Sequence, residues 1–171
     1  EEVVVTATRF PVQDRELPVG VTVVTRDDIE KSAADSLPEL LSRLPGIHLR
    51  DLTGSPNPSI DMRGFGITGD QNTLVLLDGQ RLSEIELVAV KWSAIPLDAV
   101  ERVEILRGSG AVAYGGGATG GTINIITRRP MPGEKTGQAA VGYGSYGNGT
   151  MSAGLRLGGE RAGLALHANA Q

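Results

Sequence analysis

Cysteine is missing from all 171 residues, which excludes disulfide bonds and thiolate metal sites. Aromatic residues make up only 4% of the chain, so a hydrophobic core must be built from Val, Leu, Ile and Ala. No apolar run approaches the ~20 residues of a membrane-spanning helix. The 16 basic residues are outnumbered by 20 acidic ones, and a net charge of −4 argues against a nucleic-acid-binding protein, which needs a basic face.

Patterns for catalysis and metal binding are equally scarce. The two histidines, His48 and His167, lie in different regions, so no zinc site is predicted from them. Acidic pairs such as Asp27 with Asp28 fit an exposed helix start better than an acid–base site. The sequence therefore predicts no metal, no cofactor and no enzyme activity.

Glycine, in contrast, is abundant, with 24 residues or about twice the usual share of ~7%. Seven of the fourteen residues from Gly108 to Gly121 are glycine, between two apolar runs that predict strands, Val103–Leu106 and Ile123–Ile126. Glycine loses the most conformational entropy on folding, so this density indicates positive φ angles or backbone packed against backbone. We predict an ordered loop enclosed by a surface that leaves little room for side chains.

The start of this loop, GSGAVA at residues 108–113, loosely matches the dinucleotide fingerprint GxGxxA. A true site opens a helix of about ten or more residues. Here the glycines at 115–117 would end that helix, and no acidic residue follows at the end of a second strand. A nucleotide-binding enzyme is therefore a distant alternative.

The first half of the chain predicts a mixture of short helices and strands. A strand is expected at Val19–Thr25, with a capping box at Thr25–Asp28 and a second helix start at Ser36–Glu39. The spacing of Leu37, Leu40, Leu41 and Leu44 places them on one helical face, and Pro45-Gly46 ends that helix.

Further strands are predicted at 47–51, 59–63, 73–77 and 102–107, with loops at 53–59 and 64–72 and a helical turn after Pro96. In the strand 59–63, Ile60 and Met62 are expected to face one side, and Asp61 and Arg63 the other. Segment 84–92 has no clean period and receives no assignment. Because strands and helices mix without a strict βαβ rhythm, the prediction is an α+β domain.

The pattern changes after Thr127. Residues 128–135 are charged and hold two prolines, which is typical of a boundary. The segments 137–143, 150–157 and 163–170 then alternate small or apolar residues with polar ones, separated by glycine-rich turns. Evenly spaced strands of this kind predict an antiparallel meander or barrel.

Three strand ends carry a charge next to a glycine that turns the chain: Arg63-Gly64, Asp78-Gly79 and Arg107-Gly108. Enclosed charges need partners, because an unpaired buried charge is costly. Few candidates lie nearby in the sequence, so the pattern indicates an enclosing partner surface.

In six segments taken in order, the chain resembles the plug domain of TonB-dependent outer-membrane receptors. The segments are EVVVTA (2–7), ELLSRLPGI (39–47), IDMRG (60–64), LLDGQR (76–81), IP with ERVEILRG (95–96 and 101–108), and YG with GGTINIIT (114–115 and 120–127). Ser109 and Ala111 depart from the Pro and Ser that the family prefers, which leaves the conformation of that loop open.

The resemblance implies an α+β fold: a globular plug domain with a small mixed β-sheet, short helices and Gly-rich loops, followed by the first strands of a truncated antiparallel β-barrel. It divides the chain into a TonB-box segment and linker (1–12), the plug (13–131) and about three barrel strands (132–171). A 22-stranded barrel needs more than ~200 residues at ~9–11 per strand. Only about 40 residues follow Pro132, so we expect a piece of a longer receptor.

The resemblance also implies roles for individual residues. Residues of the TonB box would add as a strand to the C-terminal domain of TonB: Glu2, Val3, Val4, Val5, Thr6 and Ala7. Arg63 and Arg107 would form ion pairs with the barrel wall. Residues of the ligand-facing loops are expected to be Ser55, Asn57, Phe65, Ile67, Gln71 and Trp92. The structural glycines are expected to be Gly64, Gly79, Gly108, Gly115, Gly120 and Gly121.

The implied function is active transport of a scarce nutrient, foremost a ferric siderophore, with haem and cobalamin as related choices. The implied partners are TonB, the chain's own β-barrel and the outer membrane of a Gram-negative bacterium, with the plug inside the barrel and the N-terminus periplasmic. The main alternative is a stand-alone soluble periplasmic binding module that keeps the plug fold without a barrel.

Overall fold

The chain forms two compact units, residues 1–127 and 128–171. The computed structural model describes residues 4–5, 12–13, 20–51, 57–64, 66, 69–82, 90–108, 119–143, 149–160 and 162–170. In chain order the elements are β1 (Val4–Val5), β2 (Val12–Gln13), β3 (Val21–Val24), α1 (Arg26–Lys31), α2 (Leu37–Ser42), β4 (Ile47–Arg50), β5 (Ser59–Met62), α3 (Gly69–Asn72), β6 (Thr73–Leu77), β7 (Gln80–Arg81), the 3₁₀ helices η3 (Trp92–Ala94) and η4 (Leu97–Ala99), β8 (Val100–Arg107), β9 (Gly121–Thr127), β10 (Lys135–Tyr143), β11 (Gly149–Gly158) and β12 (Gly163–Ala170).

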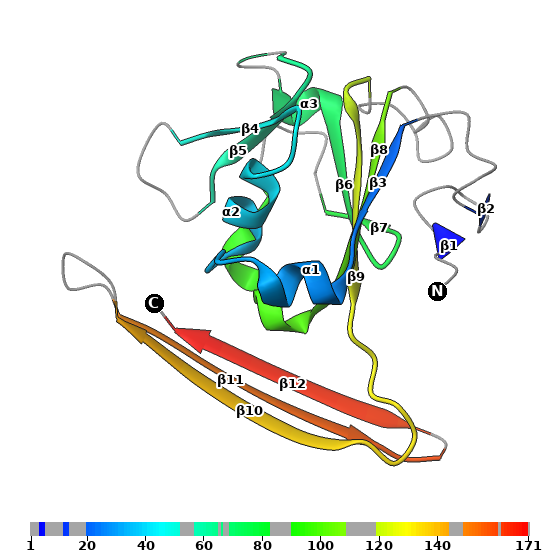
Figure 1. The fold of residues 1–171 in the computed structure, drawn as a ribbon, viewed down its shortest axis with the longest axis vertical. Coiled ribbons are helices and arrows are strands. Elements are labelled where there is room, and N and C mark those ends of the chain that lie inside the picture. The colour runs from blue at the N-terminus through cyan, green and yellow to red at the C-terminus, as the bar shows by residue number, and fades with distance from the viewer. Residues whose placement is uncertain are drawn as a thin grey trace. The chain divides into compact units, whose positions relative to one another are not determined.

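A five-stranded mixed sheet organises the first unit, with strand order β3-β8-β9-β6-β7 (Figure 1). Strands β6 and β9 run parallel, and the other neighbours run antiparallel. Strands β8 and β9, which flank the glycine-rich segment, pair with Glu104 opposite Asn124. Parallel neighbours need a crossover, and the chain between β6 and β9 supplies it through β7, η3, η4 and β8. The predicted small mixed sheet is confirmed.

One face of this sheet carries the hydrophobic core. Because side chains alternate along a strand, Val75, Ile105 and Ile123 share one row on this face. Their cluster includes Ile29 from α1 and Leu41 from α2. Full burial of each such side chain contributes about 1.5–3 kcal/mol. The core therefore holds the two short helices, which are too short to be stable alone.

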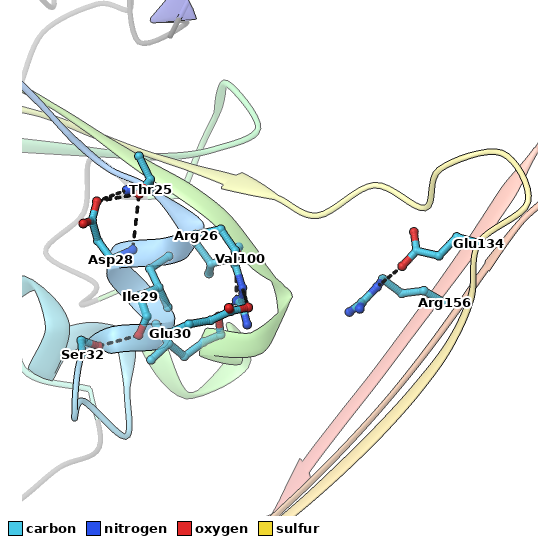
Figure 2. Close-up of polar contacts among 10 residues, drawn as sticks. Thr25, Arg26, Asp28, Ile29, Glu30, Ser32, Val100, Glu134 and Arg156 are labelled. Atoms are coloured by element: carbon cyan, nitrogen blue, oxygen red, sulfur yellow. Dashed lines mark hydrogen bonds and ion pairs between the residues drawn. The ribbon is translucent and has the colours of Figure 1, made fainter. Parts of the chain in front are cut away.

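Helix α1 begins where the sequence predicts it. The Thr25 side chain accepts a hydrogen bond from the backbone N–H of Asp28, and the Asp28 side chain accepts one from the backbone N–H of Thr25. The side-chain hydrogen bond from Thr25 lowers the pKa of the Asp28 carboxyl. From the same helix, Arg26 donates through Nη1 to the carbonyl of Val100 at 3.0 Å (Figure 2). The same Nη1 also donates to the carbonyl of Leu97 at 3.3 Å. Arg26 thus fastens α1 to the start of β8.

Helix α2 is capped by Ser36, whose side chain accepts from the backbone N–H of Glu39. It ends at Ser42, two residues earlier than the leucine spacing suggests, so Leu44 lies beyond the helix and is half-buried. Gly46 then turns the chain with a φ of 74°. The sequence expected a loop throughout 64–72, but α3 forms at Gly69–Asn72.

The second unit is a three-stranded antiparallel meander, β10-β11-β12. Its large hydrophobic side chains lie on one face and are exposed, since Val141 pairs with Met151 and Leu155 with Leu166. Arg156 projects from the opposite face, where it is buried and donates through Nε to Glu134 at 2.9 Å (Figure 2). Each strand therefore separates an apolar face from a polar one.

No helix in the described part of the chain is long and apolar enough to cross a bilayer.

The Glu134–Arg156 pair predicts a response to acid. The hydrogen bond from Arg156, followed by that from the Met131 backbone, lowers the pKa of the Glu134 carboxyl from 4.5 to about 2. Because the pKa in the folded state lies below that of the unfolded chain, the pair stabilises the meander above about pH 4.5, and this stabilisation is lost as the pH falls towards 2.

We expect Arg156→Gln to raise the titration midpoint of the Glu134 carboxyl towards 4.5, as measured by NMR of the labelled carboxyl carbon. A midpoint that stays near 2 in this variant would assign the low pKa to the Met131 backbone instead.

Candidate ligand-facing loops and partner-binding strand

The chain between β5 and β6 is shaped by an acidic side chain. Asp61 is 3% exposed, and its Oδ2 accepts a hydrogen bond from the backbone N–H of Gly66 at 2.7 Å. Gly69, the first residue of α3, packs so closely on Asp61 that an added Cβ would lie 2.8 Å from the Asp61 Cβ. Alternation along β5 places Asp61 on the face opposite Ile60 and Met62, and the structure buries Asp61 on that face as well. The alternating pattern of residues 59–63 does not indicate this burial, because alternation predicts only that neighbouring side chains face opposite sides of a strand.

A second anchor lies where the chain enters β5. The side-chain oxygen of Asn57 accepts from the backbone N–H of Ser93 at 3.1 Å, and the indole Nε1 of Trp92 donates to the carbonyl of Pro58 at 3.0 Å. These bonds tie the end of the predicted loop 53–59 to η3. Two segments that lie more than thirty residues apart in sequence are thereby held together.

Trp92 itself is a core residue. Its side chain is 3% exposed and belongs to the hydrophobic cluster that also contains Ile60 and Val100. The prediction that Trp92 faces a ligand is wrong, because both the indole ring and its N–H are occupied inside the domain. An aromatic residue in a segment without periodicity gave no indication of its direction.

Replacing Trp92 with Phe keeps most of the apolar contact but removes the hydrogen bond to Pro58. We expect the free energy of unfolding to fall by about 1–2 kcal/mol, because the Pro58 carbonyl loses a buried donor. Urea unfolding followed by circular dichroism measures this. A Trp92→Phe variant as stable as the parent would contradict the anchoring role.

The predicted structural glycines within the described part of the chain occupy constrained positions. Gly64, Gly79 and Gly108 have φ values of 77°, 81° and 112°, which residues with a Cβ rarely adopt. Gly121 has no room for a Cβ, which would lie 2.4 Å from the Leu106 carbonyl oxygen. Gly120 is buried and donates its N–H to the Asn72 carbonyl at 2.8 Å. Close backbone approach is thus the reason for glycine at the start of β9.

A buried polar row on the opposite sheet face was missed by the sequence analysis. Glu104 and Asn124 are both 0% exposed, and Glu104 is paired with Arg102 at 2.9 Å. Asn124 donates towards Glu104 at 3.5 Å and accepts from the backbone N–H of Gly79 at 3.2 Å. The row therefore links β8 and β9 to the turn after β6. The sequence signal that could have predicted this row is the presence of Glu104 and Asn124 inside otherwise apolar strands.

Comparison with known proteins identifies the family of the chain. A family model described as TonB-dependent Receptor Plug Domain matches residues 13–122, which is more than half of the chain. The chain belongs to this family. Vitamin B12 transporter BtuB of Vibrio cholerae is 39% identical over 160 residues, covering 92% of this chain and 26% of the transporter. The chain thus spans about a quarter of the length of the curated relatives it matches.

Solved structures share the plug fold. The alcaligin outer membrane receptor FauA from Bordetella pertussis has a TM-score of 0.72 at 25% identity, over 96% of this chain and 28% of the receptor. The ferric enterobactin receptor PfeA from Pseudomonas aeruginosa has a TM-score of 0.67 at 30% identity, over 91% of this chain and 24% of the receptor. The predicted family and fold class, a plug followed by partial barrel strands, are confirmed.

Two residues of the predicted TonB box, Val4 and Val5, form a short strand. In β1, Val4 pairs with Gln13 and Val5 with Val12, in a two-stranded antiparallel arrangement. Within the described residues β1 has no second neighbour, so one of its edges is unpaired there. An isolated pair of two-residue strands is marginally stable, which makes it easy to rearrange.

The two arginines predicted to contact a barrel differ in their surroundings. Arg107 donates to the Thr22 hydroxyl at 2.5 Å and to the Pro45 carbonyl at 2.9 Å, both inside the plug. An arginine carries five N–H donors, so these bonds do not exhaust its capacity. Arg63 is exposed and has a φ of 73°. Ion pairs of either residue with a barrel stay a prediction.

Several predicted site residues lie outside the described part of the chain: Glu2, Val3, Thr6, Ala7, Ser55, Phe65, Ile67 and Gly115. Gln71 lies in α3, but its side chain is not described. Among the described residues, no group of three or more His, Asp or Glu side chains could hold a metal ion.

Proposed function

We propose that this chain is the gate of a TonB-dependent outer-membrane transporter for a metal chelate. The observation that carries the proposal is the plug-family match over residues 13–122. The names of its relatives support it: a vitamin B12 transporter, an alcaligin receptor and a ferric enterobactin receptor. In this proposal residues 1–12 hold the TonB-binding segment, 13–131 the plug and 132–171 the first strands of the barrel.

The second unit supports a place in the outer membrane. Val141, Tyr143 and Met151 are 77%, 86% and 61% exposed on one face, whereas Arg156 is buried on the other. Alternation between an apolar and a polar face suits a wall between lipid and a polar interior. We therefore propose that the apolar face contacts lipid. We also propose that the N-terminus of the chain is periplasmic, where TonB would bind it.

The proposed ligand-binding surface consists of loops 53–59 and 64–72, with Ser55, Asn57, Phe65, Ile67 and Gln71 as contact positions. Support comes from one anchored residue in each loop, because Asn57 is tied to Ser93 and Gly66 to Asp61. A loop that is partly fixed before binding loses less entropy when it binds a ligand. The ligand class is a metal chelate, either a corrinoid or a ferric siderophore.

Transport would require force on the N-terminal segment. Strand addition to TonB through residues 2–7 supplies main-chain hydrogen bonds that do not depend on particular side chains. The open edge of β1 supports this role. Ion pairs from Arg63 and Arg107 to the barrel wall would then hold the plug reversibly between transport cycles.

Calorimetry with cyanocobalamin and ferric enterobactin tests the ligand assignment. We expect the complete receptor to bind one of them, and the 171-residue chain alone to bind it at least about a hundredfold more weakly, because the barrel loops are missing. Tight binding by the chain alone would favour a stand-alone periplasmic module. Binding of neither probe by the complete receptor would contradict these chelates as ligands.

A further inference from the structure

Asp61 is a buried carboxylate to which the plug family match assigns no role. With 3% of its surface exposed, it has lost nearly all contact with water. Burial of a polar group is costly unless hydrogen bonds replace the lost water. The bond from the Gly66 N–H to Oδ2, at 2.7 Å, supplies one of them. It joins the end of β5 to a residue five positions further along the chain.

The backbone that leads from Asp61 to Gly66 includes a non-glycine residue in the left-handed region. Arg63, Gly64 and Gly66 have φ values of 73°, 77° and 67°, all in the left-handed region. For Arg63 this conformation is strained and persists only where surrounding contacts enforce it. The Asp61–Gly66 bond spans all three residues and supplies such a contact.

The same side chain also limits where α3 can begin. An added Cβ at Gly69 would lie 2.8 Å from the Asp61 Cβ and 3.0 Å from its Cα. Asp61 therefore contacts the chain on both sides of residues 67–68, through its carboxylate at Gly66 and its Cβ at Gly69. Among the described residues of this segment, Gly66 and Gly69 are therefore both positioned against this one side chain.

We propose that Asp61 is a positioning residue that presets the 63–72 loop in its ligand-binding shape. The inference rests on the proposed function, in which this loop faces the chelate. Asp61, being buried, does not touch the ligand. It acts by fixing the backbone of the loop before binding, so that less entropy is lost when the complex forms.

The test uses the complete receptor with Asp61→Asn, which keeps the shape of the side chain but replaces one carboxylate oxygen with an NH₂ group. Asp78→Asn is the matched control, since Asp78 also accepts a backbone hydrogen bond, from Thr127 at 2.9 Å, but at the other end of β6 from α3. Calorimetry gives the Kd for cyanocobalamin and for ferric enterobactin. Hydrogen exchange of peptides spanning residues 63–72 gives the protection of the loop without a ligand.

We expect Asp61→Asn to weaken binding of the probe that the parent receptor binds by about tenfold and to speed exchange in 63–72. Asp78→Asn should leave Kd within about threefold and the loop exchange unchanged. A Kd that Asp61→Asn leaves unchanged would overturn the proposal. An equal increase in Kd in both variants would also overturn it, because a general loss of plug stability affects both variants alike. If the parent binds neither probe, the proposed ligands fail, and unchanged exchange in Asp61→Asn would still overturn the positioning role.

Discussion

Gly121→Ala is expected to prevent the central sheet of the plug from forming in its present register. The new methyl group would lie 2.4 Å from the Leu106 carbonyl oxygen and 2.7 Å from Met62 Cε. The Met62 side chain can move, but the Leu106 oxygen belongs to the backbone of β8, which pairs with β9 along its length. A φ of 156° at this position adds backbone strain.

We expect this change to lower the free energy of unfolding by about 3 kcal/mol or more, at the upper end of overpacking effects. Trp92 is the only tryptophan and is buried in the first unit, so its fluorescence during urea unfolding reports on that unit. Gly20→Ala is the matched control, because no atom lies within 4 Å of its added Cβ. A Gly121→Ala variant as stable as Gly20→Ala would show that β8 and β9 do not approach as described.

Val4→Pro is expected to abolish binding to the C-terminal domain of TonB while the plug sheet stays folded. Strand addition uses backbone N–H groups, and proline has none. Val4 lies in β1, outside the five-stranded sheet, so the core does not depend on it. We expect at least about a hundredfold loss of affinity by calorimetry with the purified TonB domain.

Val4→Ala is the control for this experiment, since it removes the side chain but keeps the N–H group. Its affinity should stay within a few-fold of the parent. Equal losses in Val4→Ala and Val4→Pro would mean that TonB recognises the valine side chain rather than the strand. Undiminished binding by Val4→Pro would remove this segment from the partner site altogether.

Features set by neighbouring residues could be predicted from the sequence. The Thr25–Asp28 capping box and the Ser36 cap use side chains within three residues of the groups they bind. The strands around the glycine-rich segment also follow from short apolar runs, and they pair as β8 and β9. Such signals are local, so they can be recognised without knowledge of the tertiary structure.

Features set by packing between distant segments could not be predicted. Helix α3 has no apolar periodicity, and it forms where Gly69 packs against Asp61. The family resemblance implies a ligand-facing Trp92, yet its indole N–H donates to the Pro58 carbonyl and its ring is buried in the core. Both features depend on packing between different elements, since Gly69 of α3 contacts Asp61 of β5 and Trp92 of η3 binds the carbonyl before β5, so no local pattern predicts them.

Energy-dependent uptake is the most direct test of the proposed gate. Radiolabelled cyanocobalamin and ferric enterobactin would be supplied to cells that carry the complete receptor, with and without TonB. We predict that one probe accumulates only when both TonB and the receptor are present, and that Val4→Pro reduces its uptake to the level without TonB. Accumulation that is equal with and without TonB would contradict the account.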